Sequence, residues 1–413
     1  MRGTLLPRIW QYDPTLHAPA RYRRGCSYDA FLPETLETLP PIAADVAGTI
    51  SAAENAIGVL NAVAQPALQP LARLLLRTES IASSKVEGMQ VDALALARAE
   101  ARQDAGGAIG NDAAEVLANI NAMELAVEDA AAAERLETRH LEDIHRVLLA
   151  TAPNADRVAG VVRTTQNWIG GNDYNPCGAA FVPPPPENVD ALLIDLIDFS
   201  NDESLPPLAQ AALAHAQFET IHPFEDGNGR TGRALVQVIL RRRQIAPAYV
   251  PPISVLLAAQ KELYIRGLVG FREGRQDEWL EVFAVAATRA SELASAYLVR
   301  VQELQAEWTD RLAGIVKRTD ATAWLLIKEL PGNPIMSAAI ALARTGRSRP
   351  RVHEAIDQLV LAGVLLPLGQ GRRNRLWEAA GLLDLLADLE AAVPAADARV
   401  SSHRAGADLS ESG

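Results

Sequence analysis

A short segment of the chain concentrates the residue types that bind and transfer phosphate groups. It runs His222-Pro-Phe-Glu-Asp-Gly-Asn-Gly-Arg-Thr-Gly-Arg233. Helical patterns at Pro207–Glu219 and Gly229–Arg243 place its glycines in the turn that opens the second helix. Glycines there let an anion approach main-chain N–H groups, and a helix N-terminus adds unpaired donors and the positive end of its dipole. The segment therefore predicts a polyphosphate site.

The charged side chains of this segment complete such a site. Arg230 and Arg233 project from nearly one face of the helix, where their guanidinium forks match phosphate oxygens. Asp226 could hold Mg²⁺ between two phosphates, and His222 could accept a proton from an incoming hydroxyl. Each feature alone also suits an ordinary turn or a solvated helix face. Their uninterrupted order favours the functional interpretation.

The segment resembles the signature of the Fic family, His-Pro-Phe-x-Asp/Glu-Gly-Asn-Gly-Arg-x-x-Arg, at every specified position. The resemblance implies a protein adenylyltransferase, which moves AMP from ATP onto a Ser, Thr or Tyr hydroxyl. It implies His222 as the general base and Asp226 as the Mg²⁺ ligand. The nucleotide-binding residues that it implies are Gly227, Asn228, Gly229, Arg230 and Arg233. Attack at the α-phosphate rests on the resemblance alone.

The block Asn154–Pro186 combines β-formers, a glycine cluster and four consecutive prolines, which predicts a short β-hairpin between helices. The resemblance implies that this hairpin is a flap that pins the target segment by main-chain pairing. The flap residues that it implies are Gln166, Asn167, Trp168, Ile169, Phe181 and Val182. An ordinary surface hairpin is the alternative.

A second motif, Ser83-Ser-Lys-Val-Glu87-Gly88, lies upstream. It resembles the inhibitory motif of one Fic class, Ser/Thr-x-x-x-Glu-Gly/Asn, which is carried on a helix before the core. A Glu87 carboxylate paired with Arg233 would occupy the arginine that the γ-phosphate needs. We therefore expect Glu87, with Ser83 and Gly88, to autoinhibit the enzyme. Without the downstream signature, Glu87 would be interpreted as a solvated charge at a helix end.

Composition favours a mainly α fold of two or three domains, because 413 residues exceed one ordinary core and only 5% are aromatic. The first forty residues are predicted to be irregular. The expected units are an N-terminal region with the inhibitory helix (1–110), a Fic-type helical bundle with its flap (111–275), a connecting helix (276–318), a winged helix-turn-helix (319–390) and a disordered tail (391–413).

The winged helix-turn-helix is predicted from three short helical patterns, Ala321–Leu330, Met336–Ala343 and Ser348–Ala362, followed by two strand-like runs. Its basic residues suit phosphate contacts with DNA. They are Arg344, Arg347, Arg349, Arg351, Arg372, Arg373 and Arg375. Glu354 and Asp357 interrupt this face, so contact with protein is the alternative.

The net charge of −12 argues against a chain that coats nucleic acid as a whole. Cys26 and Cys177 lie far apart in no metal-ligand spacing, which predicts reduced thiols and a cytoplasmic protein. No signal peptide or membrane span is expected. The expected partners are ATP with Mg²⁺ and a target protein, which can be the chain itself. A homodimer, through the helical pattern at Glu278–Lys317, is left open.

Two other classes of function also remain open. The same fold could remove AMP or transfer UMP or phosphocholine, although Gly229 stands where phosphate-transferring relatives carry lysine. A DNA-binding regulator with a Fic sensor domain is the third interpretation. An intact His222 and the full arginine set count against that regulator.

Overall fold

The computed structural model describes residues 2–12, 14, 17–36, 41–62, 69–90, 93–104, 107–368 and 375–392. Helices dominate these residues, so the mainly α prediction is confirmed. Residues 369–374 of the predicted wing, with Arg372 and Arg373, lie outside the described residues. So does most of the predicted tail, residues 393–413.

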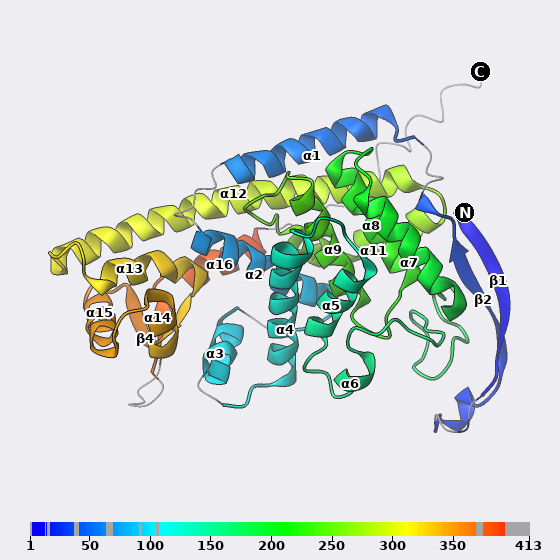
Figure 1. The fold of residues 1–413 in the computed structure, drawn as a ribbon, viewed down its shortest axis with the longest axis horizontal. Coiled ribbons are helices and arrows are strands. Elements are labelled where there is room, and N and C mark those ends of the chain that lie inside the picture. Colours follow the sequence, from blue (N-terminus) through cyan, green and yellow to red (C-terminus); the bar gives the residue numbers. More distant parts are fainter. Residues whose placement is uncertain are drawn as a thin grey trace, which may run out of the picture.

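A helical body holds most of the chain (Figure 1). Its helices are α1 (Ala44–Ala62), α2 (Gln69–Val86), α3 (Ala93–Asp104), α4 (Asn111–Leu125) with a π-helical turn (Ala126–Ala130), α5 (Thr138–Leu148), α6 (Ala155–Val158), α7 (Pro186–Asn201), α8 (Pro207–Ile221), α9 (Asn228–Arg242), α10 (Ile253–Ala259), α11 (Lys261–Arg272) and α12 (Gln276–Ile315). Figure 1 shows α1 lying along the long helix α12 on one side of this body.

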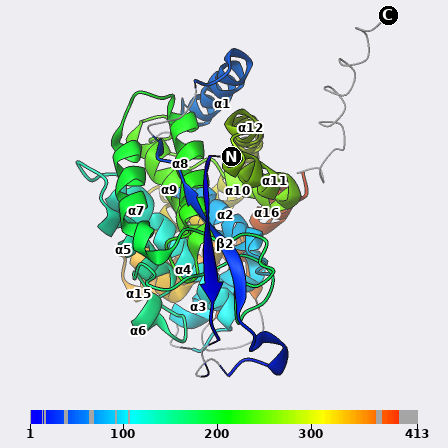
Figure 2. The same ribbon diagram turned by 90° about the vertical axis from the view of Figure 1, so that its right-hand side faces the viewer.

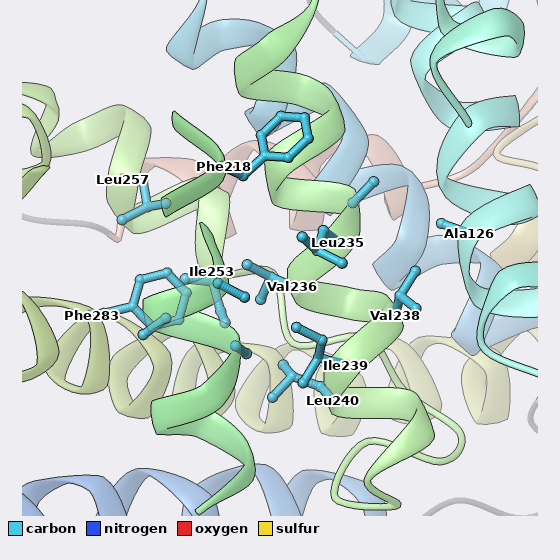
Figure 3. Packing of buried hydrophobic residues seen from close by; sticks show 14 of the residues in the cluster. Ala126, Phe218, Leu235, Val236, Val238, Ile239, Leu240, Ile253, Leu257 and Phe283 are labelled. Atoms are coloured by element: carbon cyan, nitrogen blue, oxygen red, sulfur yellow. The ribbon is translucent and has the colours of Figure 1, made fainter. Parts of the chain in front are cut away.

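The two helices that flank the phosphate-binding segment form the centre of the core. α8 is buried on every side from Leu208 to Ile221, and α9 is buried from Arg230 to Leu240. Figure 3 shows the apolar side chains of α9 among residues of the surrounding helices. Those labelled neighbours include Phe218 of α8, Ile253 of α10 and Phe283 of α12. A helix buried all round is fixed in place, so the loop between α8 and α9 has rigid ends.

The N-terminus forms a β-hairpin, so the prediction of irregular structure there is wrong. β1 (Gly3–Trp10) pairs antiparallel with β2 (Cys26–Pro33) from Gly3↔Pro33 to Trp10↔Cys26. Figure 2 shows this ribbon in front of the helices. A short 3₁₀ turn (Ala20–Tyr22) lies in the connection. Pro7 interrupts a strand-like pattern in sequence but is tolerated in β1, whose only partner is β2.

The two cysteines are joined in a disulfide, which corrects the prediction of reduced thiols. Cys26 at the start of β2 is bonded to Cys177, and the two Cα atoms lie 6.0 Å apart. The two cysteines are far apart in the sequence, but the N-terminal hairpin lies beside the loop that holds Cys177 and so brings them together. Tyr22 stacks on Tyr174 there, with ring centroids 5.3 Å apart.

The C-terminal part packs around the far half of α12. It contains α13 (Thr322–Glu329), a 3₁₀ turn (Leu330–Gly332), β3 (Ile335–Ser337), α14 (Ala338–Thr345), α15 (Arg349–Leu361), β4 (Leu365–Leu368), β5 (Leu376–Ala379) and α16 (Leu382–Ala391). The strands form an antiparallel sheet in the order β3-β5-β4. Trp308 and Leu312 of α12 belong to the core of this part, whereas Trp279 and Phe283 belong to the core of the helical body. α12 therefore contributes to both cores.

Among the described residues, α12 is also the one helix long and apolar enough to cross a membrane. Half of its most apolar window is buried inside the protein. Packing against α1, α8 and α11 accounts for this apolar composition.

Candidate active site

The loop between α8 and α9 is a tight turn that strained backbone and side-chain bonds hold in shape. His222 ends α8 in the left-handed region, with φ 51° and ψ 59°, which is costly for a residue with a Cβ. Gly227 precedes α9 with φ 73°. The Asn228 side chain accepts from the main-chain N–H of Phe224 and donates to its carbonyl, both at 2.9 Å. Asn228 thus uses its amide to close the loop.

His145 of α5 braces this loop from the other side. Its Nδ1 accepts from the main-chain N–H of Gly160 at 2.9 Å, so Nε2 carries the proton and donates to the carbonyl of Asp226. The ring also stacks on Phe224 at 3.8 Å between centroids. Burial lowers the pKa of His145 to about 4, which keeps this neutral tautomer at physiological pH. No motif around His145 in the sequence marks its contacts with the loop.

Both predicted phosphate-binding arginines are buried and hold unsatisfied donors. Arg230 lies 3.6 Å from Glu115 and 4.0 Å from Asp226, yet its Nε and Nη1 have no hydrogen-bond partner among the described residues. Arg233 Nη1 likewise lacks a hydrogen-bond partner within the described chain. Buried guanidinium groups with free N–H bonds favour an incoming anion with several oxygens.

Glu87 lies at the opening of α9, just beyond the end of α2. Its Oε1 accepts from Arg233 Nη2 at 2.7 Å. A Cβ added to Gly229 would lie only 2.0 Å from the same oxygen. The carboxylate of Glu87 therefore fills the space that Gly229 leaves open at the helix N-terminus. Burial alone would raise the pKa of Glu87, but Arg233 and Arg230 bring it below its ordinary value.

Ser83 and Gly88 help to set the position of Glu87. Arg233 donates from Nε to Ser83 Oγ and from Nη2 to the Ser83 carbonyl, both at 2.8 Å. α2 ends at Val86, and Gly88, two residues further on, turns the chain with a φ of 92° that suits glycine. Lys261 of α11 donates to the carbonyl of Val86 at 2.6 Å and so caps the helix. Lys261 was not found from sequence, because nothing near it marks a contact with α2.

Asp226 is exposed, with 77% of its side chain accessible, and its Oδ1 accepts from the N–H of Gly227. Among the described residues no three His, Cys, Asp or Glu side chains converge to make a metal site. This suits Mg²⁺ bound through a nucleotide, because that ion commonly takes one or two carboxylates and completes its shell with phosphates and water. Asp226 is the residue of this loop that would hold it.

The predicted flap is held against the loop by side-chain bonds. Asn167 donates to the carbonyls of His222 and Phe224 at 3.1 and 2.9 Å. Gln166 donates to the carbonyls of Asn167 and Pro183. These two side chains therefore bind main-chain atoms of this protein. The buried Arg163, missed from sequence, ties the same loop by donating to the carbonyl of His222 at 2.8 Å.

The flap is less regular than the predicted hairpin. Its two arms meet in a single antiparallel bridge between Ile169 and Phe181. Trp168 packs edge-on against Trp10, with centroids 5.5 Å apart. Val182 accepts from the main-chain N–H of Phe31, so β2 lies beside the second arm. The N-terminal hairpin thus completes the small β structure that the flap itself lacks.

A cleft of about 440 Å³ opens between β2, the flap and the end of α11. Phe181 and Val182 line it from the flap, and Arg272 lines it from α11. The guanidinium of Arg272 lies 3.9 Å from the centre of the Phe181 ring. The flap edge at Phe181 and Val182 is therefore accessible from this cleft.

The chain resembles known proteins over this part. Residues 135–240 match the model of the Fic/DOC family, and residues 48–128 match that of the Fic/DOC family N-terminal region. Protein adenylyltransferase fic-1 of Caenorhabditis briggsae is 41% identical over 113 residues, which is 26% of this chain and 20% of that protein. Protein adenylyltransferase Fic of Drosophila willistoni is 34% identical over 136 residues, 31% of this chain and 25% of that protein.

These alignments therefore cover only a fifth to a quarter of the length of those relatives. The crystal structure of a Fic family protein from Desulfovibrio desulfuricans G20 covers 83% of this chain and 98% of its own, with a TM-score of 0.50 at 21% identity. This likeness concerns the fold. The family assignment rests on the two family models, which identify residues 48–128 and 135–240 as the N-terminal and main regions of a Fic/DOC family protein.

Proposed function

We propose that this chain transfers AMP from ATP to a hydroxyl of a protein and that Glu87 holds the reaction off. The observation that carries the proposal is the carboxylate of Glu87 beside Gly229, 2.7 Å from Arg233. An anion of the protein itself lies where the helix N-terminus and two buried arginines favour phosphate.

The residues around the loop suit each step of this transfer. Burial, together with the charge of Arg163, lowers the pKa of His222 to about 4, so the imidazole is neutral at pH 7 and can accept a proton. The target oxygen attacks the α-phosphorus while His222 takes its proton. The bond from that phosphorus to the bridging oxygen breaks, and pyrophosphate leaves.

Binding of the leaving group is assigned to the arginines. Arg230 and Arg233 offer the free N–H groups that pyrophosphate oxygens require. A bound Mg²⁺, with Asp226 and the phosphates of the nucleotide as ligands, would neutralise phosphate charge. Gly229 leaves room for the anion beside the main chain, in the space that Glu87 now fills, whereas Gly227 lies against Leu148 and His145 and serves the turn through its positive φ. Asn228 serves this site by closing the loop.

Inhibition follows from competition for Arg233. While Glu87 is paired with it, the γ-phosphate meets a filled site and a like charge, so ATP binds weakly or in an unproductive pose. The target segment is assigned to the cleft beside Ile169, Phe181 and Val182, where it can pair with main-chain groups.

The test compares wild type, Glu87→Gly and Glu87→Gly/His222→Ala. Each is incubated with ATP and Mg²⁺, and its intact mass is measured by mass spectrometry. We expect Glu87→Gly to gain the mass of one or more AMP groups and the other two to gain little or none. Cell lysate with labelled ATP supplies other targets where self-modification is absent. A phosphate-sized gain would contradict AMP transfer, and no labelling in either assay would contradict enzyme activity.

Contact of the C-terminal part with DNA remains a prediction. Arg344, Arg347, Arg349 and Arg351 are exposed on or beside α14 and α15, which suits contact with DNA. Exposed Glu354 and Asp357 lie on the same helix as two of them. Binding of labelled duplex DNA at two salt concentrations would decide this prediction.

A further inference from the structure

Glu219 lies in the last turn of α8, one helical turn before His222. Its Oε2 lies 4.0 Å from His222 Nδ1. Its other oxygen, Oε1, is buried, as is His222 Nδ1, and neither has a hydrogen-bond partner among the described residues. The Glu219 carboxylate therefore lies close to the unpaired His222 Nδ1 and keeps one oxygen of its own unpaired, so the contact between the two side chains is incomplete in this state of the protein.

The charges around His222 explain why it needs such a partner. Arg163 and Arg272 both lie near enough to disfavour a charged imidazole. Accepting a proton from a hydroxyl would add a third positive charge to this buried place. The main chain of Glu219 and the charge of Glu87 oppose this effect, and Glu87 must leave the site for ATP to bind. The carboxylate of Glu219, 4.0 Å from Nδ1, is then the acidic group beside the ring.

We propose that Glu219 is the positioning residue of His222. Its carboxylate, with its own main-chain carbonyl, accepts from Nδ1–H, which leaves Nε2 free for the hydroxyl of the target. The hydroxyl proton then moves to Nε2 and Glu219 stabilises the imidazolium, which later returns the proton to solvent. This inference rests on the proposed function for its kinetic part, while the pairing itself rests on the geometry.

Glu219 has a titration that makes the pairing measurable. Burial and the charge of Glu87 raise the pKa of Glu219 to about 7, while Arg233 and Arg272 oppose this. Tyr264 also faces this group. Because only the ionised form can stabilise the imidazolium, the transfer rate should rise with pH through the pKa of Glu219. The pKa of His222 itself is near 4 and cannot produce that inflection.

The first experiment tests the pairing of Glu219 with His222 without relying on enzyme activity. The ring nitrogens of His222, assigned by comparison with His222→Ala, are followed by NMR from pH 5.5 to 8.5. We expect an inflection near pH 7 in wild type, its loss in Glu219→Gln and its retention in Glu79→Gln. Glu79 is the matched control, because it is also buried with its pKa raised to about 7. A flat wild-type curve, or an inflection that survives Glu219→Gln, would overturn the pairing.

The second experiment measures AMP transfer in the Glu87→Gly background over the same pH range. We expect Glu219→Gln to lower kcat about tenfold or more, in line with other partners of catalytic histidines, with little change in KM for ATP. The inflection of the Glu87→Gly protein should lie below pH 7, because the charge of Glu87 no longer raises the pKa of Glu219. It should vanish in Glu219→Gln, and Glu219→Asp should restore part of the rate. An unchanged kcat and pH profile would refute the role. Absence of transfer by Glu87→Gly itself would refute the proposed function and leave the NMR result to judge the pairing.

Discussion

Arg233 connects the predicted inhibitory motif to the predicted phosphate site at the level of single atoms. Its guanidinium reaches Ser83 Oγ, the Ser83 carbonyl and Glu87, and only 2% of its side chain is exposed. A lysine has one ammonium and could not span these acceptors in fixed geometry. The same fork therefore serves either the protein's own carboxylate or a phosphate.

Ser83 should contribute part of the inhibition. Ser83→Ala removes one acceptor and leaves Arg233 Nε unsatisfied, which costs roughly 1–3 kcal/mol for a charged donor. We expect AMP transfer to rise about tenfold, and less than in Glu87→Gly, because the carboxylate contact remains. Initial rates of AMP transfer by Ser83→Ala, by Glu87→Gly and by the variant with both substitutions measure the two contributions.

Ser84→Ala is the control for that comparison. Ser84 is the next residue of α2, but its hydroxyl donates to the carbonyl of Ser80 and accepts from Asn119 instead of Arg233. It should leave the rate near that of wild type. Equal activation by both substitutions would mean that α2 was merely loosened and that Ser83 has no specific part.

At the level of elements, α2 is held in place by three of its neighbours. Asn119 of α4 donates to the carbonyl of Ser80 at 2.7 Å. Glu79 accepts from the N–H and hydroxyl of Ser254 at the start of α10, at 2.8 and 2.6 Å. Lys261 of α11 caps the other end. Glu87 thus extends from a helix whose orientation is fixed by polar contacts as well as by the core.

Glu79 should make stability depend on pH. Burial raises its pKa to about 7, despite its hydrogen bonds with Ser254. The folded state therefore holds a proton that the unfolded state has released between about pH 4.5 and 7, so stability falls as pH rises through this window. Glu79→Gln keeps a hydrogen-bond acceptor and a donor for Ser254 in its side-chain amide, but it cannot ionise. We expect its Tm to exceed that of wild type at pH 8.

The same comparison at pH 5 supplies the control, since Glu79 is then neutral in the folded protein. The difference between Glu79→Gln and wild type should nearly disappear there. Thermal unfolding by circular dichroism at both values measures it. A constant difference across pH would show that Glu79 is ionised throughout and that its bonds with Ser254 compensate for burial.

Local patterns explain which elements the sequence predicts. The periodicity of α8 and α9 and the glycines between them mark the phosphate-binding loop, because each signal lies within a few residues of the next. The pairing of β1 with β2 depends on residues far apart, and Pro7 weakens the local strand pattern. The strand pattern of the flap was overestimated, since its arms meet only at Ile169 and Phe181.

Contacts between residues far apart in the chain could not be predicted from the sequence, for the same reason. Lys261 and Arg163 carry no motif, and their roles depend on which carbonyls the fold brings to them. Glu219 could have been noticed one turn before His222 on a predicted helix. Its spacing alone, however, does not show that its oxygen is buried without a partner.

At the scale of the whole molecule, the C-terminal part contacts α2, the helix of the predicted inhibitory motif. The turn Leu330–Gly332 packs on the first residues of α2, and the charges of Glu329 and Arg344 act on Arg73 of that helix. Leu71 and Leu330 belong to the same buried cluster. The C-terminal part therefore packs against the first turns of the helix that precedes Glu87.

The N-terminal hairpin is attached to the flap at the opposite end of the molecule. The disulfide between Cys26 and Cys177 spans 151 residues of sequence. Asn175 donates to the carbonyl of Tyr22 beside it. The bond bears on the predicted cytoplasmic location, because such bonds persist in oxidising compartments and are rare in a reducing cytosol. Reduction should release the flap from β2.

Replacing both cysteines with serine should lower stability and weaken binding of the target. The chain-entropy model gives about 5 kcal/mol for a loop of this length, as an upper bound because β2 also bonds to Val182. We expect a lower Tm and, in the Glu87→Gly background, a higher KM for the target with KM for ATP unchanged. Wild type treated with a reductant should behave like the double variant, and the double variant itself should not respond to it. If reductant leaves the Tm and both KM values of wild type unchanged, the covalent bond does not hold the flap, and the contacts of Tyr22 and Trp10 suffice.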